Sequence, residues 1–233
     1  MRRADSQMAM KARRLHSWRV TPAEARRIQN ELRARIELRD RLGPVRMIAG
    51  ADVALDLVRR RAIAGVIVFR FPGMEEVERA SAVRPLTFSY VPGLLSFREA
   101  PALLAAFARL RHSPDLLFFD GHGYAHPRRF GIACHLGLLL DRPAIGCAKS
   151  LLIGEHQEPA LAAGSHAPLF DDGETIGAVL RTRNRVKPVY ISIGHRISLD
   201  RAVEFTLAAT DGFRIPRPTR LADHFVEAAK RGK

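Results

Sequence analysis

Cysteine is scarce in this chain, which has only Cys134 and Cys147 among its 233 residues. Neither lies at zinc-ligand spacing from a histidine, so the sequence excludes a disulfide-rich scaffold and a zinc finger. Both follow apolar patterns and are expected to be buried thiols in a reducing cytoplasm. A single disulfide between them stays open.

Long apolar runs are also missing. The longest fall far short of the roughly 20 residues that span a bilayer, and residues 1–20 lack the apolar stretch of a signal peptide. We therefore expect no membrane segment and a cytoplasmic protein. An organelle transit peptide is disfavoured by Asp5 and by a poor amphipathic pattern.

No linker rich in proline, glycine or serine divides the chain, and no internal repeat is present. We expect a disordered basic extension over residues 1–20 and a single domain over residues 21–233.

Lysine is rare, contributing five of the 38 basic residues, while the other 33 are arginines. The net charge of +14 favours a phosphate-rich partner such as nucleic acid, although an arginine excess is also typical of a GC-rich genome. Lys149 is the lysine of interest, because it follows the strand-like run 143–147. Its compact ammonium group suits contact with one phosphate.

Hydrophobic periodicity predicts an α/β fold with a mixed sheet that is flanked by helices on both faces. Strands are expected near 45–55, 62–71, 75–87, 115–120, 143–147, 175–182 and 188–194. Helices are expected at 21–42, 100–111, 130–140 and 198–211, followed by a tail that contains residues 215–218.

Two aspartates lie in strands that otherwise read as buried. Asp120 ends the apolar run 116–119, and Asp52 lies near the middle of 45–55. A carboxylate in such a place is costly unless a cation offsets its charge. The alternatives are ordinary: Asp120 caps the following turn, and Asp52 bonds a neighbouring backbone amide.

Glu99 is a third acid near the start of a helical pattern. As an alternative role, Ser96 and Glu99 fit a capping box, in which the glutamate only caps the helix. Pro101 weakens that alternative, since proline favours the first helical turn and would place Glu99 just ahead of the helix.

Three carboxylates on two strands and a helix start are hard oxygen ligands of the kind that magnesium or manganese prefers. Two such ions, about 3.5–4 Å apart, can stabilise both oxygens of a phosphodiester displacement. The order strand-Asp, hairpin, helix-Glu, strand-Asp is that of a ribonuclease H-like nuclease.

Four sequence blocks resemble the endonuclease V family over about residues 45–223. They are Gly50-Ala51-Asp52-Val53, Tyr90-Val91-Pro92-Gly93-Leu94-Leu95-Ser96-Phe97-Arg98-Glu99, Asp120-Gly121-His122-Gly123 through Arg129, and Gly146-Cys147-Ala148-Lys149. The resemblance implies a ribonuclease H-like fold and a repair endonuclease that uses Mg²⁺, with Mn²⁺ able to substitute. Its expected substrate is DNA containing deoxyinosine, or RNA containing inosine, cut at the second phosphodiester bond 3′ to the lesion. A monomer is expected.

The resemblance also assigns residues. Asp52, Glu99 and Asp120 would bind the metal, Lys149 would approach the scissile phosphate, and Asp223 would lie nearby in the active site. Residues matching the pocket for the extruded base are Gly93, Leu95, Gly121 and Gly131.

Further roles follow from residue type. Tyr90 lies in a loop and could wedge or stack against bases, or instead pack over the helix start. His126 is a candidate to position a phosphate or the attacking water, and Arg128 and Arg129 are candidate phosphate contacts. Ser89 replaces the family's usual proline before Tyr90, which predicts a looser wedge loop.

Two alternatives remain at this point. One is a nuclease of this fold with another specificity, directed at nucleic-acid structure or at RNA. The other is a nucleic-acid-binding module without activity, which the three intact acids argue against.

Overall fold

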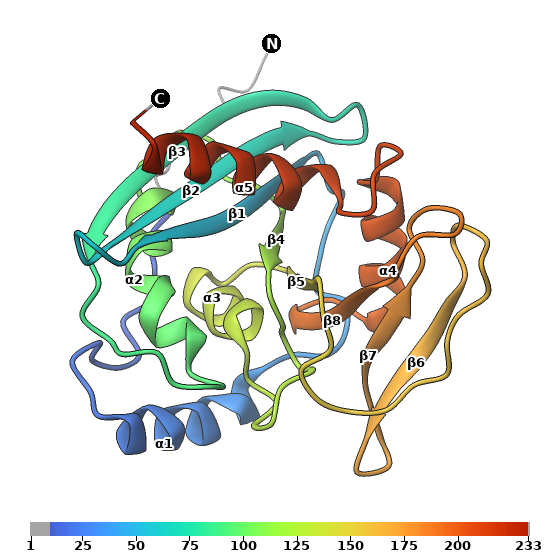
Figure 1. Ribbon diagram of the computed structural model, residues 1–233, viewed down its shortest axis with the longest axis horizontal. Helices are drawn as coiled ribbons and strands as arrows, with labels where there is room; N and C mark the ends of the chain where they lie inside the picture. The colour runs from blue at the N-terminus through green and yellow to red at the C-terminus, as the bar shows by residue number, and fades with distance from the viewer. Residues whose placement is uncertain (1–9, 233) are drawn as a thin grey trace.

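The computed structural model describes residues 10–232, and its centre is one eight-stranded sheet (Figure 1). The strand order is β3-β2-β1-β4-β5-β8-β7-β6. The strands are β1 (Met47–Asp56), β2 (Arg61–Arg70), β3 (Glu75–Pro85), β4 (Leu116–Asp120), β5 (Ala144–Ala148), β6 (His166–Asp171), β7 (Glu174–Leu180) and β8 (Val189–His195). Two neighbouring pairs, β1-β4 and β4-β5, are parallel, and the other neighbouring pairs are antiparallel.

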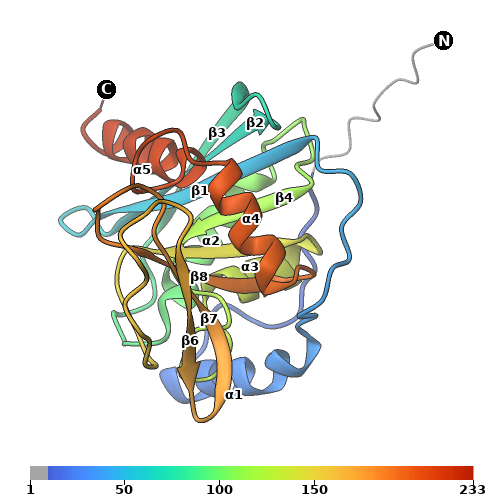
Figure 2. The same ribbon diagram turned by 90° about the vertical axis from the view of Figure 1, so that its right-hand side faces the viewer.

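Helices cover both faces of the sheet, as the sequence predicts (Figure 2). Helices α2 (Leu95–Phe107) and α3 (Ile132–Leu140) pack on one face, and α4 (Leu199–Ala208) and α5 (Arg217–Lys230) pack on the other. Strand β1 alternates between the two cores, because Ala49 and Ala51 face α2 and α3 whereas Ile48 faces the opposite side. Each apolar layer is therefore closed by its own pair of helices.

Gly50 lets α5 approach the centre of the sheet. A Cβ atom at residue 50 would lie 2.1 Å from the backbone oxygen of Pro218, near the start of α5. No side chain fits there, so the glycine brings α5 onto β1 and carries Asp223 towards the strand ends.

Helix α2 begins earlier than its sequence predicts. It starts at Leu95 and passes through Pro101, although proline removes one helical hydrogen bond. The first turn contributes the buried side chain of Phe97 to the core, and this burial outweighs the lost bond. Glu99 consequently lies in the second turn of the helix and not ahead of it.

Two further expectations about elements are wrong, and one strand was not predicted. The tail around residues 215–218 leads directly into α5, which has 14 residues. The predicted helix 21–42 ends early, as α1 (Pro22–Leu32) with a short 3₁₀ turn, Arg33–Arg35. Edge strand β6 is unexpected, because Pro168 interrupts its alternating pattern, and an edge strand is where a sheet tolerates proline.

The N-terminal segment is ordered from residue 10 onward, which corrects the prediction of a disordered extension for residues 10–20. Met10 is buried, the backbone of Arg13 donates to Leu139, and Trp18 packs against the core. Residues 1–9 lie outside the described part of the chain. Cys134 and Cys147 are free, buried thiols. Among residues 10–232, no helix has the length and apolar character needed to cross a membrane.

Candidate active site

The ends of three neighbouring strands place the predicted acids and the predicted lysine together. Strands β1, β4 and β5 are parallel, so their carboxyl ends reach the same edge of the sheet. Ala51 pairs with Phe119, which puts Asp52 and Asp120 next to one another along that edge, and Lys149 follows β5 directly. Helix α2 adds Glu99 to the same edge.

Asp52, Glu99 and Asp120 form the acid cluster, in which burial and mutual repulsion disfavour negative charge. Burial, followed by the charge of Asp120, raises the pKa of Asp52 to about 7. Burial and then Asp52 raise the pKa of Glu99 to about 8. The pKa of Asp120 is also raised by burial, against the opposing effect of Lys149. The cluster is therefore short of positive charge.

Lys149 supplies one of the missing positive charges. Its Nζ lies 2.5 Å from Oδ2 of Asp120 and 3.3 Å from Oδ2 of Asp223 on α5. Burial lowers the pKa of this lysine, but the pairing with Asp120 outweighs burial and leaves the pKa raised. The guanidinium of Arg214 donates to the backbone oxygen of Lys149 at 2.6 Å, which fixes the loop after β5.

The acid cluster fits a divalent cation by charge and by donor type. Three carboxylates with raised pKa values would be stabilised in their ionised form by such an ion. Across residues 10–232, however, no three His, Cys, Asp or Glu side chains are already arranged to hold a metal. Lys149 occupies one oxygen of Asp120, and Oδ1 of Asp52 accepts the backbone N–H of Val53. Binding would require these side chains to turn.

The ordinary alternatives for the acids have different outcomes. Asp52 does bond a neighbouring amide, as one alternative expected, yet it also belongs to the acid cluster. The capping-box alternative for Glu99 is wrong. Ser96 lies inside α2, and its hydroxyl forms a hydrogen bond with Nδ1 of the buried His135 at 2.9 Å.

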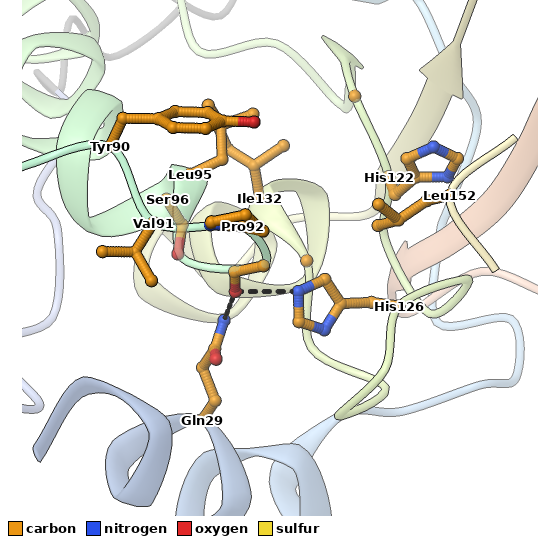
Figure 3. Close-up of a pocket in the computed structure, with 13 residues that line it drawn as sticks. Gln29, Tyr90, Val91, Pro92, Leu95, Ser96, His122, His126, Ile132 and Leu152 are labelled. Carbon is orange, nitrogen blue, oxygen red and sulfur yellow. Dashed lines mark hydrogen bonds between the residues drawn. The ribbon is translucent and has the colours of Figure 1, made fainter. Parts of the chain in front are cut away.

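A cavity of about 200 Å³ adjoins the acid cluster, far above the roughly 10–15 Å³ that one water needs. We call it the glycine pocket (Figure 3). The four residues matched to the base pocket, Gly93, Leu95, Gly121 and Gly131, all line it, together with Tyr90 and His126. Gly121 directly follows Asp120 of the acid cluster, so the pocket and the carboxylates share one wall.

The walls of the glycine pocket are mainly backbone and apolar side chains. A Cβ at Gly131 would lie 2.2 Å from the backbone oxygen of His122, so only glycine fits this wall. The sequence did not predict a place in the pocket for seven further lining residues: Gln29, Val91, Pro92, Ser96, His122, Ile132 and Leu152. One signal for Gln29 exists, because it lies on the same face of α1 as the buried Ala25, Ile28 and Leu32.

His126 is a wall residue whose two ring nitrogens are both occupied. Nδ1 accepts the backbone N–H of Arg128 at 3.1 Å, and Nε2 donates to the backbone oxygen of Gly93 at 2.9 Å. Burial, together with the charge of Arg128, lowers the pKa of His126 to about 4. The ring is therefore neutral and held in one tautomer. This geometry favours a role in shaping the pocket over contact with a phosphate or a water nucleophile.

The two arginines after His126 have different surroundings from those expected. Arg129 forms ion pairs with Asp171 at 2.7 Å and Glu174 at 2.8 Å, and its side chain is only 13% exposed. These carboxylates already offset its charge, which disfavours the predicted contact with a phosphate. Arg128 turns inward and donates to the backbone oxygen of Gly93 at 2.8 Å.

Tyr90 stands out from the pocket rim, with 71% of its surface exposed. The guanidinium of Arg98, a residue of α2, lies 5.7 Å from the centre of its ring. At this exposure Tyr90 is not part of the core, but its contact with Arg98 joins it to the start of α2, so the alternative of packing over the helix start stays open. The ring is free to stack on a ligand.

Comparisons with known proteins agree on one family. The family model described as Endonuclease V matches residues 30–224. An endonuclease V from Roseiflexus sp. (strain RS-1) is 53% identical over 206 residues, which are 88% of this chain and 92% of that protein. The crystal structure of an endonuclease V from Streptomyces avermitilis is 42% identical, with a TM-score of 0.89 over 95% of this chain and 98% of that one.

A nucleic-acid complex is among the similar structures. It is an endonuclease V from Ciona intestinalis bound to a 24mer DNA that contains an inosine followed by a ribo-adenosine. It is 26% identical, with a TM-score of 0.76 over 90% of this chain and 98% of that chain. These similarities confirm the ribonuclease H-like fold that the order of acids predicts.

Proposed function

Because this chain belongs to the endonuclease V family, we propose that it is a DNA-repair endonuclease that recognises deoxyinosine and cuts the strand beside it. The cut is at the second phosphodiester bond 3′ to the lesion and leaves a 3′-hydroxyl and a 5′-phosphate. One observation carries this proposal: the glycine pocket shares a wall with the acid cluster through Gly121 and Asp120. A base held in the pocket keeps its own strand close to the carboxylates.

The pocket suits a purine that has left the base stack. Its walls offer backbone groups and apolar surface at Gly93, Leu95, Gly121, Gly131 and Ile132. Extruding a base costs a few kcal/mol, and a close-fitting pocket offsets part of this cost. Tyr90 at the rim is placed to stack against the bases that remain, at about 1–3 kcal/mol per stacked base.

Enzymes of this family are metal-dependent nucleases, and the acid cluster is the place for the cation in this chain. Asp52, Glu99 and Asp120 would hold Mg²⁺, and Mn²⁺ would substitute because it prefers the same oxygen ligands. When bound, the cation supplies Lewis-acid stabilisation of the charge that develops on the phosphate oxygens.

Lys149 and Asp223 add a positive charge and its partner to the acid cluster. The ammonium of Lys149, held between Asp120 and Asp223, provides a positive charge that is already oriented when the phosphate arrives. Asp223 orients this lysine and is half-exposed, so substrate can reach the pair. A pre-placed charge lowers the barrier because it needs no reorganisation during the reaction.

Three finer properties belong to the same proposal. The enzyme also accepts inosine in RNA, because the contacts offered by the pocket are directed at the base. It acts as a monomer, since the acids, the lysine and the pocket all come from one chain. It works in the cytoplasm.

A cleavage panel tests the function. One oligonucleotide sequence would carry deoxyinosine, inosine in RNA, uracil, an abasic site or a mismatch, each with magnesium and with a chelator. We expect magnesium-dependent cleavage of the inosine substrates at the second bond 3′ to the lesion. Cleavage that depends on the abasic site or the mismatch, and not on inosine, would contradict the proposal.

A further inference from the structure

The backbone oxygen of Gly93 accepts three hydrogen bonds, an unusual number for one carbonyl group with two lone pairs. The donors are Nε2 of Gln29 at 3.0 Å, Nε2 of His126 at 2.9 Å and Nη2 of Arg128 at 2.8 Å. Figure 3 shows the bonds from Gln29 and His126 converging on this oxygen. Three donors from two separate segments leave the Gly93 peptide little freedom to rotate.

Gln29 of α1 joins these contacts to the other side of the pocket. Its Nε2 also donates to the backbone oxygen of Phe130 at 3.0 Å, and its Oε1 accepts Nε of Arg128 at 2.6 Å. The amide can be placed only one way round, because its nitrogen faces two carbonyl oxygens and its oxygen faces a guanidinium. Gln29 is 1% exposed, so a lost bond here is not replaced by bulk water.

The two backbone segments that Gln29 holds are the ones that meet the base. Gly93 is the third residue of a tight turn, in which the N–H of Leu94 bonds the oxygen of Val91 at 3.0 Å. Proline before a glycine with φ +75° has the features of a type II turn, and this turn carries Tyr90 just ahead of it. Phe130 immediately precedes the wall glycine Gly131.

We propose that Gln29 is a positioning residue for base recognition, which sets the distance between the Gly93 turn and the Gly131 wall of the glycine pocket. The inference rests on the proposed function and adds to it a residue with no role in the chemistry. This arrangement also accounts for Ser89: the turn does not depend on a proline before Tyr90, since Gln29, His126 and Arg128 fix it from below.

The test replaces Gln29 with methionine, which keeps the length of the side chain and removes all three bonds. We expect the ratio of kcat/KM on deoxyinosine to that on undamaged duplex to fall at least about 10-fold, roughly the loss of one buried hydrogen bond or more. Most of the loss should be in KM. The single-turnover rate at saturating enzyme should stay within about 3-fold of the parent, because the acid cluster is untouched.

Thr21→Ala is the matched control. It removes the capping box of the same helix, in which Thr21 and Glu24 bond each other's backbone, and it has no contact with the pocket. We expect it to lower the melting temperature by about 2–4 °C and to leave the discrimination ratio unchanged. The control therefore separates a loosened α1 from a misplaced pocket wall.

The outcomes are distinct. A Gln29→Met protein with the parental ratio and a lowered melting temperature overturns the inference, because Gln29 would then only anchor α1. If Gln29→Met does not fold, Arg128→Lys tests the same contacts from the partly exposed side, since lysine cannot reproduce the bonds to both Gln29 Oε1 and Gly93. An unchanged discrimination ratio in Arg128→Lys would also contradict the inference. A parent protein that ignores deoxyinosine would instead refute the proposed function.

Discussion

The acid cluster and the glycine pocket share a wall, but they are stabilised in opposite ways. In the acid cluster, burial and mutual repulsion raise the pKa values of Asp52 and Glu99 to about 7 and about 8, and the charges of Lys149 and Arg98 offset this only in part. In the pocket, the polar atoms of Gln29 and both nitrogens of His126 are bonded within the protein. The acid cluster lacks positive charge, whereas Gln29 and His126 of the pocket already have hydrogen-bond partners before any ligand arrives.

This difference separates chemistry from recognition. An acid cluster that lacks positive charge favours the binding of a cation, which can then stabilise charge in the reaction. A rigid neutral pocket gains selectivity because it does not adapt to the wrong base. Substitutions in the first site should therefore change rates, and substitutions in the second should change the preference among substrates.

The largest effect is expected from Asp120→Asn. Asparagine keeps the shape of the side chain but removes the charge that pairs with Lys149 and would hold the cation. We expect cleavage of deoxyinosine DNA to fall by at least about 1000-fold, with lesion binding retained, because the pocket is unaltered. Single-turnover cleavage and a binding titration measure the two quantities separately.

Asp115→Asn is the control at the other end of the same strand. Its carboxylate accepts the backbone N–H groups of Arg46 and Met47, so its loss should lower stability and spare the cleavage rate. Parental cleavage by Asp120→Asn would break the division between the two sites, since the acid cluster would then have no role in the chemistry. Glu99→Gln should be nearly as severe as Asp120→Asn.

A smaller loss is expected from Lys149→Met. Removing an ammonium that is already oriented by Asp120 and Asp223 should lower the single-turnover rate by about 10- to 1000-fold, with little change in binding. Lys187→Met removes a lysine from the loop before β8 and serves as the matched control. If the two variants cleave alike, Lys149 is only surface charge.

Asp52, Asp120 and Lys149 were predictable because each is a charged residue in or next to an apolar strand. These three strand positions converge through the parallel pairing of β1, β4 and β5. The pocket glycines came from family resemblance, since a lone glycine has many uses. Gln29 was missed, because its partners Gly93, Phe130 and Arg128 lie more than 60 residues away and contribute mostly backbone atoms.

The elements that were missed also have a common cause. Prolines at 216 and 218 suggested a tail, although proline is well tolerated in the first turn of a helix such as α5. Pro101 suggested a helix start, although burial of Phe97 extends α2 backwards across it. At Pro101 the local rule about proline was outweighed by packing against the sheet, which no local sequence window contains.

Tyr90→Ala tests whether the rim of the pocket controls the preference among substrates. Loss of a stacking ring worth about 1–3 kcal/mol should reduce discrimination between deoxyinosine and undamaged duplex about 10-fold or more. Cleavage of a flexible single strand should suffer less, because its bases are already unstacked. Tyr90→Phe keeps the ring and should restore duplex discrimination. Equal losses on both substrates would show that Tyr90 supports the start of α2 and does not contact the nucleic acid.

The smallest expected effect is on the melting temperature. A substitution in the acid cluster should raise it, and a substitution in the pocket should lower it. Asp52 has a pKa raised to about 7 by burial and by Asp120, so its ionised form destabilises the folded state. That penalty is absent below the unfolded pKa of about 4, grows as the pH rises, and is complete above about 7. In a chelator, Asp52→Asn should therefore raise the melting temperature by a few degrees at pH 8 and make no difference near pH 4. Gln29→Met should lower the melting temperature throughout this range, because it breaks three buried hydrogen bonds and relieves no charge. Thermal melts of both variants across pH 4–8 measure this contrast. An Asp52→Asn protein that is less stable than the parent at pH 8 would mean that the acid cluster does not lack positive charge.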